Sequence, residues 1–348
     1  MAPTRFLRSL ASAHRFSKTR CRLGDTYWPH TLGRHASHPH SKALRAATAD
    51  AKRKEILGLI YALIGIFFFS LSLPLTKMAI DGFNPIFTAF VRPVIAATLA
   101  VPLLIAFKAP KFPQAHLRAF LFTIFGGVFI WPIFIASALN RTTSAHVAII
   151  VSIMPLSTAI FAVLRTKQTV SWQFWAASVL GTALLVLFAI SRGGAADADP
   201  IADLFTLIAV IASSMCYVEG AQLTQVMPGW QVISWVVILA LPICIPASFI
   251  AWVLTHHNHV ITTRSVVGLL GIGYSSMYIG FIAWYRGLKD AGTAHGSQVQ
   301  QVQAILTLGW SALLLHEKVT TPMVLIACGV IGAVLWALIS RQRIPVIS

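Results

Sequence analysis

Apolar runs long enough to cross a membrane follow one another almost without interruption from Leu57 to Ile339. A bilayer core of about 30 Å needs about 20 apolar residues in a helix that rises about 1.5 Å per residue. The chain is 57% hydrophobic and 11% charged, whereas soluble proteins carry about 25% charged residues. No stretch alternates polar and apolar residues as the strands of a membrane β-barrel do. We therefore predict an all-α integral membrane protein.

Polar breaks divide this apolar region into ten predicted spans. Several breaks carry residues that start or end helices, such as Asn84-Pro85 and Pro228-Gly229. The connections are short, so we expect a helical bundle with little mass outside the membrane. The spans cover residues 56–76, 86–107, 119–138, 145–164, 172–191, 203–223, 231–254, 266–286, 295–315 and 322–340.

Positive charge is distributed unequally between the two sides of these spans. With the amino terminus inside, the inner segments hold twelve Lys and Arg residues and the outer segments hold five. Cytoplasmic loops carry the excess of positive charge, so we expect both termini in the cytoplasm and the protein in the cell (inner) membrane. The inner residues are Lys52, Arg53, Lys54, Lys108, Lys111, Arg118, Arg165, Lys167, Arg286, Lys289, Arg341 and Arg343, and the outer ones are Lys77, Arg141, Arg192, Arg264 and Lys318.

The first fifty residues differ from the rest of the chain. They hold nine Lys and Arg residues against Asp25 and Asp50, and they lack the apolar core of a secretory signal. Their composition cannot bury a core, so we predict a disordered basic tail over residues 1–51. An organellar transit peptide and an upstream start codon are alternative readings of this segment.

An internal repeat appears where the fourth and ninth spans begin. Residues 138–146 match residues 287–295 in the Leu and in the closing small residue-Ala-His, which ends at His146 and His295. We therefore predict two five-helix repeats, residues 52–192 and 200–341. Because five is odd, the second repeat enters the membrane from the opposite side, as in secondary transporters with inverted repeats.

Short motifs occur in a set order along the spans. They are the Phe69 to Lys77 run, Arg92, the Thr143 to Pro155 run, Trp284 to Leu288, Ser297 to Gln303, and Leu315-His316-Glu317. Over about residues 55–340 this order resembles the EamA family of the drug/metabolite transporter superfamily. The resemblance implies a ten-span secondary transporter that exports or exchanges an amino-acid-like or amphipathic solute by alternating access.

The ninth span carries the most regular polar pattern. Its members recur at spacings of four, three, four and four, which places them on one helical face. We expect Gln300 and Gln303 to bind substrate in a cavity, whereas hydrogen bonding between helices is the alternative. Gln298 and Gln301 lie off this face. The stripe consists of Gly296, Gln300, Gln303, Thr307 and Ser311.

Other spans offer further candidates for the substrate site. Polar side chains in a bilayer usually face the bundle interior or a wet cavity. Proline removes a backbone hydrogen bond and can open a helix locally. For each candidate the alternative is a packing role or a simple kink. The predicted set outside the ninth span is Ser70, Pro74, Trp131, Tyr217, Tyr274 and Tyr278.

Charged side chains inside the predicted spans are few. Arg92 lies about two turns inside the second span, and we favour a structural role in which it snorkels outward or caps helix carbonyls. Glu219 lies near the cytoplasmic end of the sixth span and could reach inward. Without a buried carboxylate, the site favours an uncharged or zwitterionic amphipath. We read His146 and His295 as hydrogen-bonded residues at helix starts.

Motifs for other functions are missing from the sequence. It has no GxxxxGK[ST] run for an ATP-driven pump and no nucleophile-base arrangement, so we predict no catalytic residues, no metal and no cofactor. The formal charge of +17 lies in the tail and short loops, so we expect no nucleic-acid partner. The expected partners are a small-molecule substrate and membrane lipid, with the oligomeric state open. A membrane-embedded enzyme and a non-transporting membrane scaffold are the alternative functions.

Overall fold

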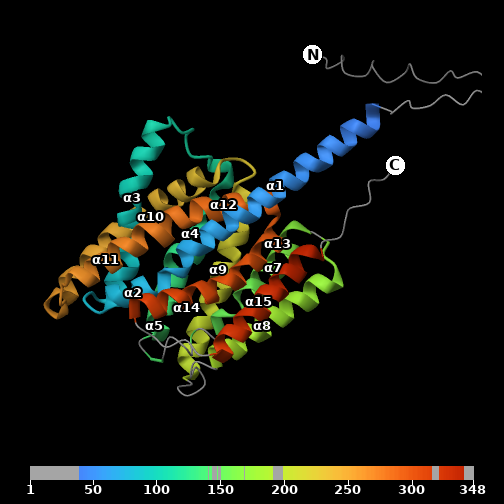
Figure 1. Cartoon of the computed structure of the whole chain (residues 1–348). Coiled ribbons are helices and arrows are strands. Elements are labelled where there is room, and N and C mark those ends of the chain that lie inside the picture. Colours follow the sequence, from blue (N-terminus) through green and yellow to red (C-terminus); the bar gives the residue numbers. More distant parts are fainter. Residues whose placement is uncertain are drawn as a thin grey trace, which may run out of the picture. The chain divides into compact units, whose positions relative to one another are not determined.

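The structure is a computed structural model that describes residues 39–139, 141–142, 147, 150–167, 169–190, 199–315 and 321–340. The segment from Thr48 onward forms one compact unit, separate from the unit that ends at Ala47. Within the described ranges the regular elements are all helical (Figure 1). The predicted all-α class is therefore confirmed. Up to position 38 the predicted tail lies outside the described residues. Residues 39–51, which the composition also assigned to a disordered tail, form the start of the helix α1 (Pro39–Ser70), so the predicted boundary of the tail is corrected.

The helices before residue 190 begin with α1 and α2, which are separated by Leu71. A 3-10 turn begins the third apolar stretch, and a π-helical segment interrupts it. The elements are α1 (Pro39–Ser70), α2 (Ser72–Ile80), α3 (Pro85–Ala106), the 3-10 turn η1 (Gln114–His116), α4 (Leu117–Ile124), the π-helical η2 (Phe125–Ile130), α5 (Trp131–Leu139), α7 (Met154–Thr166) and α8 (Trp172–Ala189).

The helices after residue 199 follow a similar order, again with π and 3-10 interruptions. They are α9 (Pro200–Leu223), α10 (Gly229–Thr255), the 3-10 turn η4 (His256–Asn258), α11 (Thr263–Gly271), the π-helical η5 (Ile272–Ile279), α12 (Gly280–Ala291), α13 (Thr293–Ser297), the 3-10 turn η6 (Gln298–Gln300), α14 (Gln301–Leu315) and α15 (Thr321–Ile339).

Six helical stretches among the described residues are long and apolar enough to cross a membrane. They are Thr48–Ile80, Pro85–Ala106, Gln114–Ala138, Pro200–Leu223, Gly229–Thr255 and Thr263–Ala291. Shorter apolar helices cover Met154–Thr166, Trp172–Leu187 and Val324–Ile339. Large apolar side chains such as Ile105, Leu254 and Ile339 are 71%, 73% and 80% exposed. Lipid is the environment that accepts such a surface, so the protein is a multi-pass membrane protein.

Side-chain caps start several helices at the breaks that the sequence indicates. The Asn84 side chain accepts hydrogen bonds from the backbone N–H groups of Ile86 and Phe87, and Pro85 occupies the first helical position. Asp199 caps α9 in the same way, again before a proline. Proline suits this position because the N–H that it lacks has no partner within the helix.

The first apolar stretch is broken at Leu71. This break lies three residues before Pro74, which occupies the first turn of α2, where a missing N–H is tolerated. The expected local opening of this helix therefore lies one turn earlier than Pro74 itself. The opening leaves backbone carbonyls at the end of α1 available to other helices.

Helices pack in pairs that are distant in sequence (Figure 1). In the most extensive contacts, α3 lies against α10, α8 against α15, α5 against α9, and α2 against α11, while α7 contacts α13. The approach of α1 to α12 is close: a Cβ on Gly287 would overlap the backbone of Ala62, and one on Gly65 would overlap Trp284. Small residues at these crossings allow backbone-to-backbone packing, which is typical of helices in membranes.

Candidate substrate site

A narrow cavity of about 80 Å³ lies among these helices. A water molecule needs about 10–15 Å³, whereas ligand pockets measure about 300–1,000 Å³, so binding of an organic solute requires the helices to separate. The lining residues are Phe69, Ser72, Leu73, Thr76, Arg92, Gly127, Trp131, Pro132, Ile135, Ala136, Val147, Val151, Met154, Ser213, Tyr217, Ser276, Met277, Phe281 and Gln303.

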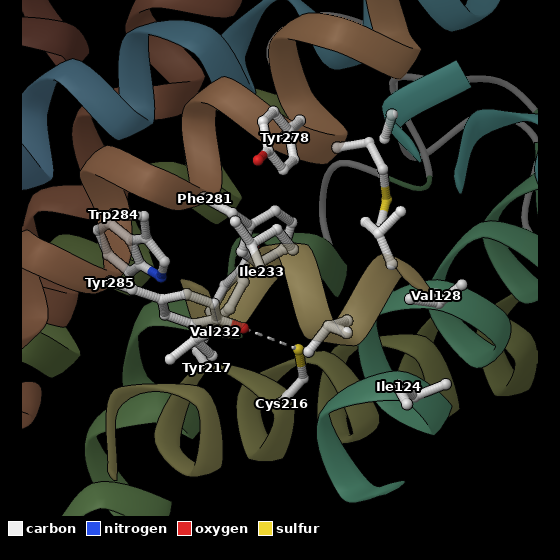
Figure 2. Close-up of a cluster of buried hydrophobic side chains, with 14 of the residues drawn as sticks. Ile124, Val128, Cys216, Tyr217, Val232, Ile233, Tyr278, Phe281, Trp284 and Tyr285 are labelled. Carbon is white, nitrogen blue, oxygen red and sulfur yellow. Dashed lines mark hydrogen bonds between the residues drawn. The ribbon is translucent and has the colours of Figure 1, made fainter. Parts of the chain in front are cut away.

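Three of the predicted site residues, Trp131, Tyr217 and Gln303, line this cavity. Tyr217 belongs to an aromatic cluster in which its ring lies 6.1 Å from Phe69 and 5.9 Å from Phe281, measured between ring centroids. Figure 2 shows Tyr217 and Phe281 with Trp284 and Tyr285 beside them; the Trp284 ring lies 5.5 Å from that of Tyr217. The rings of Phe69, Tyr217 and Phe281 form an aromatic wall of the cavity.

Ser70 and Pro74 are not among the lining residues. Ser70 is fully buried; its Oγ donates to the Phe67 carbonyl at 2.6 Å and accepts from Trp310 Nε1 at 2.9 Å. Pro74 is buried in the first turn of α2. Both residues therefore shape the break between α1 and α2 and do not line this cavity, so their role at a substrate site stays a prediction.

The tyrosines predicted on the eighth span also pack outside the cavity. The hydroxyls of Tyr274 and Thr98 lie 3.1 Å apart, and those of Tyr278 and Ser234 lie 2.7 Å apart. Tyr278 is 1% exposed and lies in the main apolar core. Each hydroxyl thus has a partner on a neighbouring helix, which satisfies it without a solute.

The polar stripe of the ninth span separates into different environments. Gln303 lines the cavity, with its Nε2 3.5 Å from the Phe69 carbonyl, and Thr307 donates to the Ser70 carbonyl at 3.1 Å. Both side chains thereby reach the carbonyls that the break after α1 leaves open. Gln300 is buried and is not part of this cavity lining, so its role at a substrate site stays a prediction. The Ser311 side chain lies outside the described ones.

The remaining glutamines form a buried group beside Gln300. Gln301 Nε2 donates to Gln298 Oε1 at 2.7 Å. Among the described residues, both side-chain polar atoms of Gln300, Nε2 of Gln298 and Oε1 of Gln301 have no hydrogen-bond partner. This group occupies η6 and the start of α14, where the helix changes from 3-10 to α geometry. A change of helix type within a span often marks a hinge.

Arg92 is the lining residue that sequence reasoning assigned differently. Its side chain does not snorkel outward: it is 8% exposed and its Nη2 donates to Ser276 Oγ at 3.1 Å. The signal was available, because a charge two turns inside a span marks a functional site by default. Ser276 and Ser213, which also line the cavity, carry no distinguishing pattern among the many small polar residues of the spans.

Glu219 does not reach the cavity. Its carboxylate pairs with Arg165 across α9 and α7, with Arg165 Nε 2.5 Å from Glu219 Oε1, and the arginine side chain is 55% exposed. Among the described residues that line the cavity, Arg92 alone carries a charge. His295 is buried, with its ring 4.8 Å from that of Phe174, and His146 lies outside the described residues.

A helical membrane protein with a polar and aromatic cavity between helices from both ends of its chain has the architecture of a membrane transporter. The EamA-like transporter family model matches this chain twice, over residues 56–190 and 200–339. The chain belongs to this family, and it is a membrane transporter.

Two further comparisons agree. The chain is 36% identical over 281 residues to the uncharacterized transporter YdeK of Bacillus subtilis (strain 168), covering 80% of this chain and 95% of that protein. It also resembles a protein of known crystal structure with a TM-score of 0.65 at 14% identity, over 83% of this chain and 98% of that one. This second likeness concerns the fold alone.

Proposed function

We propose that the protein is a secondary transporter that exports or exchanges a small organic metabolite, amino-acid-like or amphipathic, by alternating access. The observation that carries this proposal is the cavity, whose lining comes from both segments that match the family. Transporters with inverted repeats bind substrate near the bilayer midplane, where the two repeats meet. In this reading Trp131, Tyr217 and Gln303 contact the solute.

The proposal includes ten spans arranged as two inverted repeats, residues 52–192 and 200–341. The sequence match places the repeats 149 positions apart, since 287 − 138 = 149. With this offset Gly127, Pro132 and Met154 correspond to Ser276, Phe281 and Gln303. All six residues line the cavity.

The helix types and the packing support the same relationship. The π-helical η2, residues 125–130, maps with this offset onto residues 274–279, within the π-helical η5. Exchanging the repeats turns the α5–α9 contact into a contact of α12 with α1, which the structure contains as the close approach of Gly287 to Ala62. The α3–α10 and α8–α15 contacts each map onto themselves. A two-fold relationship between halves produces such a set of pairs.

Alternating access would use the interrupted helices as hinges. The cavity is too small for a metabolite, so one or more walls must move, and π-helical and broken segments are the natural places for bending. Gly127 and Ser276 place both π-helical segments at the cavity wall. Rocking of the two repeats about these segments would open the cavity to each side in turn.

Uptake into proteoliposomes tests the transport proposal. Purified full-length protein would be reconstituted with an internal solute, and counterflow of a labelled panel of amino acids, aromatic acids, amides and amines would be measured against protein-free vesicles. Saturable counterflow of at least one solute supports the proposal. A solute recovered in chemically altered form would instead favour the membrane-embedded enzyme, and no counterflow by folded protein would favour the scaffold.

Topology needs a separate measurement. Single cysteines in a cysteine-free background, placed in loops and at the carboxyl terminus, would be labelled from one side of the inner membrane. Both termini in the cytoplasm support the inverted repeat, whereas an externally labelled carboxyl terminus would exclude it.

A truncated chain that starts at Lys52 should insert and transport like the full chain if residues 1–51 are a dispensable tail.

A further inference from the structure

The buried arginine in the cavity wall points to the chemistry of the transported solute. We infer that the solute carries one carboxylate group, which binds to Arg92 with help from Ser276, while its apolar part contacts the aromatic wall. This inference rests on the proposed transport function and deepens it, because it names a substrate class and the residue that selects it.

The first observation is that the charge of Arg92 is buried without a counter-ion. The side chain is 8% exposed, and its one hydrogen bond to a described residue goes to the neutral Ser276 hydroxyl. Its Nε is buried and has no partner among the described residues. A guanidinium has five N–H donors and is always charged in proteins, so this site can accept an anion.

The second observation concerns the carboxylates that could neutralise Arg92. Those that form described ion pairs do so with other cations: Glu219 with Arg165, Asp199 with Arg141 and Asp290 with Arg286. Within the described part of the chain, no carboxylate lines the cavity or pairs with Arg92. A buried, uncompensated charge is unfavourable, and an anionic solute would compensate it.

The third observation is the match between one guanidinium and one carboxylate. The planar N–H fork of arginine fits two carboxylate oxygens, and its single charge balances a single negative charge. A doubly charged phosphate would call for a second cation, which the described lining does not offer. A cationic solute would be repelled by Arg92, because no described carboxylate lines the cavity to offset the two positive charges.

The remaining lining suits the body of an organic acid. Phe69, Trp131 and Phe281 supply aromatic surface, and Met277 supplies an adaptable thioether side chain next to Ser276. Gln303 offers both a donor and an acceptor for a further polar group of the solute. An amino acid fits this description if its amino group finds such an acceptor, and a simple aromatic or aliphatic acid fits it without one.

Binding of matched acids and amides tests the inference with the full chain in detergent. The probes are benzoate, phenylacetate and hexanoate, each compared with its neutral carboxamide by isothermal titration calorimetry. We expect at least one acid to bind wild type tenfold or more tightly than its amide. If no acid binds better than its amide, the inference is overturned without any variant being needed.

Variants assign the preference to Arg92. Arg92→Gln should reduce the acid-to-amide ratio to about one, and Arg92→Lys should retain part of it, because it keeps the charge and loses the fork. Arg141→Gln, at a surface arginine that pairs with Asp199, is the matched control and should leave the ratio unchanged. Melting curves and gel filtration establish that each variant is folded, and an unchanged ratio in folded Arg92→Gln contradicts the inference.

Counterflow separates this inference from the transport proposal. If acids bind in an Arg92-dependent manner but no solute crosses the vesicle membrane, the transport function fails and the binding site stands. If solutes cross and carboxamides compete as well as the acids do, transport stands and the role of Arg92 is refuted.

Discussion

The rings of Phe69 and Tyr217 stack with their planes 7° apart and their centroids 6.1 Å apart. The two residues come from the end of α1 and from α9, separated by 148 positions, since 217 − 69 = 148. Both rings also contact Phe281 and Trp284 from α12. This contact therefore joins helices from both halves of the chain directly at the cavity wall.

Replacing Tyr217 should separate its packing role from its hydroxyl. Tyr217→Ala removes a buried ring, a change that costs about 3–5 kcal/mol in soluble cores, so we expect a melting temperature lower by about 5 °C or more. Tyr217→Phe keeps the stack and should melt within about 2 °C of wild type. Scanning fluorimetry in detergent measures both, and equal melting of the alanine variant and wild type would contradict the packing role.

Gln303 and Gln300 should behave differently although they share a predicted helical face. Gln303→Ala removes a group that lines the cavity, so counterflow per folded molecule should fall severalfold. Gln300→Leu replaces an amide that has no partner among the described residues, and it should leave the melting temperature unchanged or raise it. A large loss of melting temperature in Gln300→Leu would indicate that a bound water or ion satisfies this amide. Equal transport by Gln303→Ala and wild type would remove Gln303 from the site.

His259 should make the protein less stable in mild acid. Its Nε2 accepts the Asn84 backbone N–H at 3.1 Å, which requires this nitrogen to be unprotonated. Burial, and secondarily the neighbouring His256, lowers the pKa of His259 below its ordinary value. The unfolded chain therefore takes up the proton first, so the stability present above about pH 6.5 is lost as the pH falls through that value and below.

The measurement compares melting temperatures at pH 7.5 and pH 5.0. Between pH 7.5 and pH 5.0 the melting temperature of wild type should fall more than that of His259→Gln, which cannot titrate at this position. His116→Gln removes an exposed histidine before α4 and should leave the pH dependence of wild type intact. The prediction is wrong if wild type and His259→Gln show the same loss.

Gly287 should be essential for folding because of the helix that it contacts. A Cβ at this position would overlap the backbone of Ala62, so Gly287→Val should force α12 away from α1. Overpacking costs about 1–3 kcal/mol or more, and we expect most of the monodisperse protein to be lost on gel filtration. Gly309→Val is the control, since nothing lies within 4 Å of a Cβ there. Normal yields of both variants would show that the two helices can separate without harm.

The lengths of the apolar runs and the helix-starting residues were readable from the sequence. Burial in lipid requires every backbone polar group to bond within its own helix, so apolar length alone indicates the helical class. Local caps such as Asn84 and Asp199 depend only on their neighbours in the chain. The predicted break at Asn84-Pro85 agrees with the structure, and α9 begins at Pro200, three residues before the predicted sixth span. Trp131, Tyr217 and Gln303 were also identified as candidates and line the cavity.

Only the tertiary structure decided which polar side chains share the cavity. Helical spacing predicts which side chains share a face only where the rotation per residue about the helix axis is constant. Segments of π and 3-10 helix change this rotation. Tyr274 and Tyr278 lie inside η5, and Gln300 lies in η6, so their directions could not be extrapolated from the regular parts of the spans. Tyr278 bonds to Ser234 and does not line the cavity, whereas Arg92 bonds to Ser276 and also lines the cavity. Both outcomes depend on helices far away in the sequence.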